Sequence, residues 1–178
     1  MEKKITFIFS ATIDSLNYIL PECGNGSLVF FTADTEKAAA GLVEFCAASG
    51  VEAFPYICSD KNLAAIAPAV IGCADKFGGI DTLIFDVSRD DKTSLFLDIT
   101  EEEFVFYTNA INEFHSLCRC ALPYMLGRDG ASVIARAFKE PSGAAQAAYN
   151  GAVSEMVKAM RGEFENFGVK VETVIFQK

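Results

Sequence analysis

Few residues of this chain combine a reactive side chain with a place from which it could do chemistry. His115, the only histidine, lies in a segment with a helical pattern, and no serine or cysteine nucleophile can be paired with it. Tyr149 carries a phenol whose solution pKa of about 10 requires a neighbouring cation for proton transfer at neutral pH. We therefore interpret His115 as a buried or interfacial residue and Tyr149 as a packed helix residue.

Asp86 is the most interesting acidic residue, because it lies near the end of an apolar run over 80–87 that predicts a strand. The five residues 88–92 that follow this run are all polar. Open α/β sheets bind ligands beyond the carboxyl ends of their strands, so this position suits a binding site. A solvated loop explains the same residues, and we favour that interpretation.

The sequence predicts six strands that alternate with helices. The expected strands cover residues 5–10, 27–32, 51–57, 80–87, 131–138 and 169–176. These runs lack a clean two-residue alternation, which is typical of strands buried on both faces of a parallel sheet. Such an order requires right-handed crossovers. We predict an α/β fold with a doubly wound, parallel six-stranded sheet in three layers, as a single Rossmann-like domain over residues 1–178.

Capping residues and glycines set the expected helices. A short helix follows residue 11 with Asp14 as its cap, and a second covers 36–48 with Asp34 or Thr35 as its cap. The third should run from a cap at Ser59 or Asp60 to Lys76, with a kink or break at Pro68. Two long helices, 100–126 and 144–167, complete the set. The first of these opens on an acidic first turn after Thr100, as in a capping box.

Composition excludes several classes of function. The 178 residues are 51% hydrophobic, enough for one substantial core, yet no uncharged apolar run is long enough to span a membrane. A net charge of −9 argues against nucleic-acid partners. The six cysteines form no metal-binding pattern and suggest reduced, buried thiols. With no export signal at the N-terminus, we expect a soluble, cytoplasmic protein without a metal.

Four blocks in the second half of the chain resemble the short-chain dehydrogenase/reductase family. They are Lys76-Phe77-Gly78-Gly79-Ile80-Asp81-Thr82-Leu83-Ile84, Thr100-Glu101-Glu102-Glu103-Phe104, Arg119-Cys120-Ala121-Leu122-Pro123-Tyr124-Met125, and Glu163-Phe164 with Gly168-Val169-Lys170-Val171. Their spacing is close to that of the family, so the resemblance covers most of the chain. It implies a Rossmann-like fold and NAD(P)-dependent oxidoreductase chemistry.

The residues that would bind the cofactor differ from those of the family. The family has a glycine-rich turn after the first strand, where this chain has Ser10 and Ala11 followed by Asp14, an acidic group where phosphates would lie. Thr32 and Ala33 stand where the family reads the ribose. Asp86 lies in the place of an Asn-Asn-Ala-Gly turn. These five positions, Ser10, Ala11, Asp14, Thr32 and Asp86, are the candidates for cofactor contact by position alone.

The catalytic residues implied by the resemblance are also largely replaced. The family's asparagine and serine positions hold Ala110 and Ala137. One alignment keeps the tyrosine as Tyr149 but places Val153 at the lysine position. A second, ungapped alignment places Gln146 and Asn150 at the tyrosine and lysine positions. A Tyr-x-x-x-Lys pair is therefore absent on either alignment, and Tyr149 is the one candidate catalytic residue that remains.

The two long helices predict a dimer. Helices 100–126 and 144–167 carry more apolar and small residues than one sheet face needs, and small residues let helices approach closely. In the family these two helices form the principal dimer contact. We therefore predict a homodimer through helices 100–126 and 144–167, with a small molecule or a protein as a further partner.

Two hypotheses follow. The first is a shortened and degenerate member of the family that has lost dinucleotide binding and catalysis, needs no cofactor, and serves as a dimeric binding or assembly module. The family continues beyond the sixth strand to a substrate-covering segment, and we expect that lid to be absent. The alternative is an NAD(P)-dependent oxidoreductase that holds the cofactor in an atypical way and uses Tyr149 with a lysine from elsewhere. The number of replaced motifs favours the first, a protein that is not an enzyme.

Overall fold

The computed structural model describes residues 3–23, 26–87 and 95–175. Six parallel strands form one sheet in the order β3-β2-β1-β4-β5-β6. The strands are β1 (Ile5–Phe9), β2 (Leu28–Ala33), β3 (Glu52–Ile57), β4 (Thr82–Phe85), β5 (Ser132–Ala137) and β6 (Lys170–Ile175). The predicted doubly wound α/β fold is confirmed, and each strand ends within two residues of its predicted bounds.

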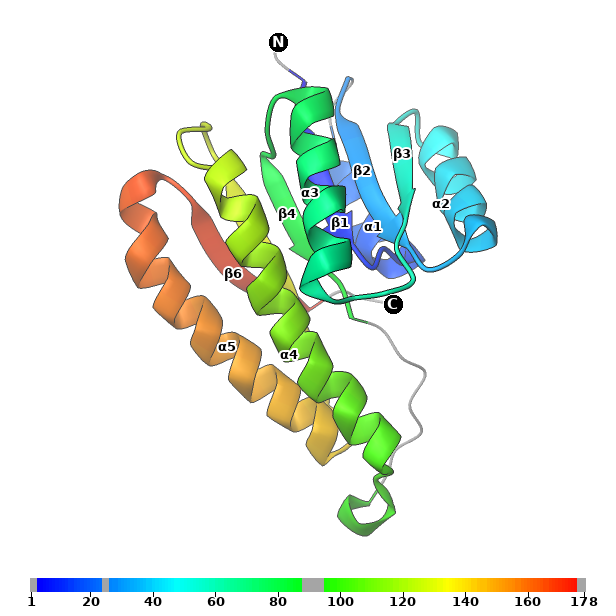
Figure 1. The fold of residues 1–178 in the computed structure, drawn as a ribbon, viewed down its shortest axis with the longest axis vertical. Coiled ribbons are helices and arrows are strands. Elements are labelled where there is room, and N and C mark those ends of the chain that lie inside the picture. The colour runs from blue at the N-terminus through cyan, green and yellow to red at the C-terminus, as the bar shows by residue number, and fades with distance from the viewer. Residues whose placement is uncertain (1–2, 24–25, 88–94, 176–178) are drawn as a thin grey trace.

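Helices cover both faces of the sheet, with α1 and α2 on one face and α3, α4 and α5 on the other (Figure 1). The helices are α1 (Ile13–Ile19), α2 (Glu36–Ala48), α3 (Leu63–Phe77), α4 (Glu101–Ala121) and α5 (Ala144–Phe164), with short 3-10 turns η1 (Leu20–Glu22), η2 (Phe96–Asp98), η3 (Leu122–Tyr124) and η4 (Glu165–Phe167). The long helices α4 and α5 lie side by side and extend past the strands, with η2 at the tip (Figure 1).

Alternate side chains of the strands supply two cores. Phe7, Phe9 and Phe85 point toward α3, α4 and α5, and the rings of Phe9 and Phe85 stack with centroids 5.9 Å apart. Ile8 and Phe31 point the opposite way, toward α1 and α2. All five side chains are buried. Burial on both faces explains why the strand sequences are continuous apolar runs.

Three local predictions about the helices are wrong. Thr12, and not Asp14, caps α1, because its hydroxyl accepts a hydrogen bond from the Ser15 N–H. Asn62, and not Ser59 or Asp60, caps α3 through the Ala65 N–H. Pro68 lies inside α3, which is continuous from Leu63 to Phe77, so the predicted break is wrong and the predicted kink stays a prediction.

Candidate functional site

The candidate site lies at the carboxyl ends of β1 and β4, where the strand order changes direction. Open α/β sheets bind ligands at this switch point, because the loops on either side diverge and leave a crevice. Here the start of α1, Asp86 after β4 and the end of β5 are joined by side-chain hydrogen bonds. The polar loop 88–92 that the sequence placed beside Asp86 lies outside the described residues.

The turn after β1 contains a residue with a positive φ that is not a glycine. Ser10 has a φ of 55°, a left-handed conformation that side chains rarely adopt. Thr32 closes the turn, because its hydroxyl accepts from the Ser10 N–H at 2.7 Å and its carbonyl accepts from the Ala11 N–H at 3.0 Å. The N–H groups of Ser10 and Ala11 therefore already have partners on β2.

The start of α1 is also satisfied from within the chain. Thr12 and Ser15 form a reciprocal capping box, in which the Thr12 N–H donates to the Ser15 hydroxyl at 2.9 Å. The Thr12 hydroxyl donates in turn to a carboxylate oxygen of Asp86. The N–H groups at the start of a helix can bind an anion. Here the N–H groups of Thr12 and Ser15 already donate to the Ser15 and Thr12 hydroxyls.

A buried cation joins the two acidic candidates. Arg136, on β5, donates from Nη1 to Asp86 Oδ1 at 2.9 Å and from Nη2 to Asp14 Oδ2 at 3.0 Å. The Arg136 and Asp86 side chains are 5% and 0% exposed, and that of Asp14 is 26% exposed. Burial by itself would lower the pKa of Arg136, but the charge of Asp86, with hydrogen bonds to Asp86 and Asp14, raises it instead.

This triad, defined as Asp14, Asp86 and Arg136, corrects two sequence interpretations. Asp86 is buried in an ion pair and is not part of a solvated loop, because the guanidinium offsets the cost of its burial. Asp14 is an ion-pair partner and not a helix cap. Sequence reasoning missed Arg136, although one signal was available: it is the only charged residue in the predicted strand 131–138.

The structure therefore brings the five positional candidates together at one end of the sheet. Ser10, Ala11 and Thr32 are bonded to one another, and Asp14 and Asp86 share Arg136. Ser10, Ala11 and Asp86 also line a cavity at this edge. Any role for these residues in cofactor contact stays a prediction.

Tyr149 lies beneath this site and is fully buried on α5. Its hydroxyl donates to the Arg136 carbonyl at 2.9 Å. Burial raises the pKa of the phenol far above its ordinary value, and the charge of Asp86 raises it further, while Arg136 acts in the opposite direction. Val153, at the lysine position of that alignment, is buried as well. The described surroundings of Tyr149 fit the packed residue that the sequence predicted.

Gln146 and Asn150, the residues of the second alignment, form hydrogen bonds to neighbouring segments of the chain. Gln146 accepts from the Ser142 N–H at 2.8 Å and donates to the Tyr107 hydroxyl at 2.8 Å. Asn150 binds both the N–H and the carbonyl of Phe138, at 3.0 and 2.8 Å. These hydrogen bonds connect α5 to the segment after β5 and to Tyr107 of α4.

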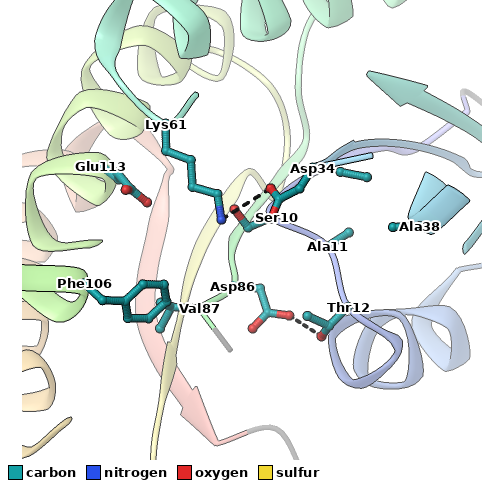
Figure 2. Close-up of a pocket in the computed structure, with 11 residues that line it drawn as sticks. Ser10, Ala11, Thr12, Asp34, Ala38, Lys61, Asp86, Val87, Phe106 and Glu113 are labelled. Atoms are coloured by element: carbon teal, nitrogen blue, oxygen red, sulfur yellow. Dashed lines mark hydrogen bonds and ion pairs between the residues drawn. The ribbon is translucent and has the colours of Figure 1, made fainter. Parts of the chain in front are cut away.

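Beside the triad lies a cavity of about 140 Å³ (Figure 2). Lys61 and Asp34 form an ion pair across it, with Nζ and Oδ1 3.5 Å apart. Glu113 and Phe106, from α4, line the opposite side. Burial raises the pKa of Glu113 to about 7, Lys61 acts against this shift, and Asp34 adds to it. Lys61, Asp34 and Glu113 were not among the sequence candidates, because they come from three separate segments.

The cavity is small for a cofactor, since pockets for drug-sized ligands have volumes of roughly 300–1,000 Å³. Its lining pairs carboxylates and a lysine with hydroxyls, which suits a small polar molecule. Within the residues that the structure describes, no group of three or more His, Cys, Asp or Glu side chains could hold a metal ion.

The remaining candidates lie away from this site. His115 is exposed on α4, so the expected burial is wrong and an interfacial position stays a prediction. All six cysteines are free thiols, and four of them are buried, which largely confirms the expectation. Over the described ranges, no helix is long and apolar enough to cross a membrane.

Comparisons with known proteins find structural relatives alone. No protein-family model and no curated protein sequence matches the chain. A short-chain dehydrogenase from Mycobacterium thermoresistibile superposes with a TM-score of 0.84 at 17% identity, covering 96% of this chain and 66% of that one. A short-chain dehydrogenase/reductase from Serratia marcescens superposes with a TM-score of 0.81 at 17% identity, covering 97% of this chain and 73% of that one.

L-sorbose reductase from Gluconobacter frateurii, solved with NADPH and L-sorbose, superposes with a TM-score of 0.82 at 17% identity, covering 98% of this chain and 69% of that one. The chain thus spans about two thirds to three quarters of the length of these proteins. The strand order and the coverage agree with the resemblance of the sequence blocks. This chain has the fold of the short-chain dehydrogenases/reductases, in a form of 178 residues.

Proposed function

We propose that this protein is a short-chain dehydrogenase/reductase-like protein that has lost NAD(P) binding and catalysis and acts as a dimeric binding or assembly module. The observation that carries the proposal is the buried triad of Asp14, Asp86 and Arg136 at the switch point of the sheet. A dinucleotide would bring its phosphates to this end of the sheet, beside two carboxylates whose shared guanidinium is already bonded.

Two further observations support the loss of dinucleotide binding. The amide groups of Ser10 and Ala11 already donate to Thr32, so a phosphate would have to replace those bonds. The adjoining cavity of about 140 Å³ lies below the roughly 300–1,000 Å³ that is typical of pockets for drug-sized ligands. A phosphate that displaced Asp14 or Asp86 from Arg136 would leave a largely buried carboxylate unpaired.

The alternative function, an NAD(P)-dependent oxidoreductase, draws support from the structural neighbours. The Gluconobacter reductase was solved in complex with NADPH and L-sorbose. For this chain the alternative would require Tyr149 to leave its bond to the Arg136 carbonyl and to approach a cation. The proposed loss of activity needs no such rearrangement.

Titration with NADH and NADPH tests the proposal. We expect no saturable change in nucleotide fluorescence up to about 1 mM, the range of weak small-molecule binding. The sorbose reductase from Gluconobacter frateurii is the positive control. Saturation at micromolar concentration would overturn the proposed loss, and the Tyr149→Phe variant would then report whether the phenol supports reduction of a carbonyl substrate.

The dimer is the second part of the proposal. Ala147, Ala148 and Gly151 are exposed on α5, which packs against α4, and their small size allows another helix to approach closely. A two-fold axis would then pair α4 and α5 with their copies. Light scattering at tens of micromolar should give twice the chain mass of 19.3 kDa. A monomeric mass would exclude this dimer.

We also propose a cytoplasmic location. Six free cysteines with no disulfide among them are what a reducing compartment maintains. Localisation of a tagged chain by cell fractionation tests this directly, and recovery from an oxidising compartment would contradict it.

A further inference from the structure

The most exposed large apolar side chains of the described residues lie together just before α4. Leu95, Phe96 and Leu97 are 76%, 77% and 93% exposed, and we call these three residues the apolar hook. Phe104 and Val105, on the first turns of α4, are 52% and 45% exposed. A cluster of this kind on a surface that faces water marks an interaction site, since each side chain gains free energy when it leaves water.

The same pair of helices carries an apolar groove at its other end. The groove has a volume of about 320 Å³ between α4 and α5, and its apolar lining includes Leu122, Met156, Met160 and Phe164. The three side chains from α5 are only partly buried. Two methionines give this surface side chains that adapt to an inserted apolar group. The hook and the groove are therefore matched in chemistry.

We propose that the apolar hook of one copy inserts into the α4–α5 groove of a second copy, so that each dimer contains two identical contacts. This inference rests on the dimer proposed above and names the residues that hold it together. A chain's own hook cannot fill its own groove, because the part of α4 that precedes His115, about 20 Å long, separates them. Figure 1 shows the hook segment η2 at one tip of α4, far from the end where η3 follows.

Two-fold symmetry satisfies both contacts at once. An axis perpendicular to α4 near its middle would place the start of each α4 beside the end of the other. The hook at one end then lies over the partner's groove at the other end, and the same holds in reverse. Gly151 and Ala152 of α5 lie near the middle of this surface, where close approach is needed.

Charge favours the same arrangement. Asp98 and Glu101 are exposed beside the hook, and Arg119 is exposed on the α4 side of the groove. His115 also lines the groove from α4, and Glu163 lines it from α5. Antiparallel pairing of the two copies of α4 brings Asp98 and Glu101 to the partner's Arg119, with Glu163 on the far side. Opposed helix dipoles add to this preference.

Sedimentation equilibrium of the full chain tests the inference. The Leu97→Asp variant should raise the dimer dissociation constant at least about a hundredfold, because the buried charge enters both contacts. The Ile71→Asp variant is the matched control, since Ile71 is 43% exposed on α3, away from the hook and the groove. Its dissociation constant should equal that of the wild type.

A charge exchange tests the same contact without altering the apolar groups. Arg119→Glu alone should weaken the dimer about tenfold or more, and adding Asp98→Arg to it should restore most of the affinity. The hook contact would be overturned if Leu97→Asp left the dimer dissociation constant unchanged, or if adding Asp98→Arg to Arg119→Glu did not restore affinity. Either result would leave the proposed dimer itself standing. A monomeric wild type would overturn both.

Discussion

Replacing Arg136 by methionine probes the interaction on which the proposed function depends. The change keeps most of the side-chain volume and removes the guanidinium that pairs with Asp86 at 2.9 Å and with Asp14 at 3.0 Å. Asp86 is fully buried, so its carboxylate would lose its cation without gaining water. Breaking one side of a buried ion pair costs about 3–5 kcal/mol.

Urea denaturation measures this loss as a change in the free energy of unfolding. For a chain of this size the same loss lowers the midpoint of thermal unfolding by roughly 10 °C. The control is Lys158→Met, because Lys158 pairs with Glu155 at the surface, where both side chains are more than 60% exposed. That variant should stay within about 0.5 kcal/mol of the wild type.

A double variant tests the mechanism. Without its cation, the buried carboxylate of Asp86 is an unpaired charge. Adding Asp86→Asn removes that charge, so the double variant should recover part of the free energy of unfolding that Arg136→Met loses.

Two results would refute the reasoning. One is a loss below about 1 kcal/mol at pH 7 for Arg136→Met, well short of what a broken buried pair costs. The other is a double variant that is no more stable than Arg136→Met, which would mean that Asp86 does not carry the unpaired charge.

Three further predictions address single side chains. Tyr149→Phe should lower the free energy of unfolding by about 1–2 kcal/mol, because it removes a buried hydrogen bond. Because the folded pKa of Tyr149 is raised, the wild type should lose the stability that this phenol contributes as the pH rises above about 10, and the variant should not. Urea titrations at about pH 8 and 10.5 would reveal the difference. Glu113→Gln should flatten the plot of unfolding free energy against pH between about pH 4.5 and 7. The wild-type carboxyl has a folded pKa of about 7, so it stabilises the folded state below this window and loses that contribution as the pH rises across it. An unchanged plot would contradict the shift. Gly79→Ala should cost about 2 kcal/mol or more, because a Cβ would lie 2.7 Å from Arg128 Nη1 at a φ of 147°, whereas Gly72→Ala, in the open on α3, should be neutral or stabilising in the same thermal melts.

The sheet could be predicted from the sequence because each strand is encoded locally. Apolar runs such as Ile5–Phe9 and Leu28–Ala33 are buried on both faces, and that burial leaves its pattern in the residue types. Glycine and capping residues placed the helix ends to within a few residues. The caps at Thr12 and Asn62 were missed because several neighbouring polar residues could each have served, and the choice depends on backbone geometry.

The candidate site could be predicted only as a set of positions. Asp14 and Arg136 are 122 residues apart, and their ion pair forms because α1 begins at the edge of the sheet where β5 ends. No local pattern records such a pairing. The interpretation of Asp86 as part of a solvated loop failed for the same reason, since its burial depends on a cation from another strand.

The triad also explains how this fold could dispense with a cofactor. The start of a helix carries a partial positive charge, which a bound phosphate neutralises in dinucleotide-binding folds. In this chain Asp14 lies in the first turn of α1 and Asp86 accepts from the Thr12 hydroxyl, so two carboxylates supply negative charge at that place. Arg136 then balances them and fixes their positions. On the proposed function, the chain supplies from its own residues the charge that a ligand would bring, and its folded state gains nothing from NADH or NADPH. Added nucleotide should accordingly leave the thermal midpoint of the wild type unchanged, because only a ligand that binds the folded state can raise it.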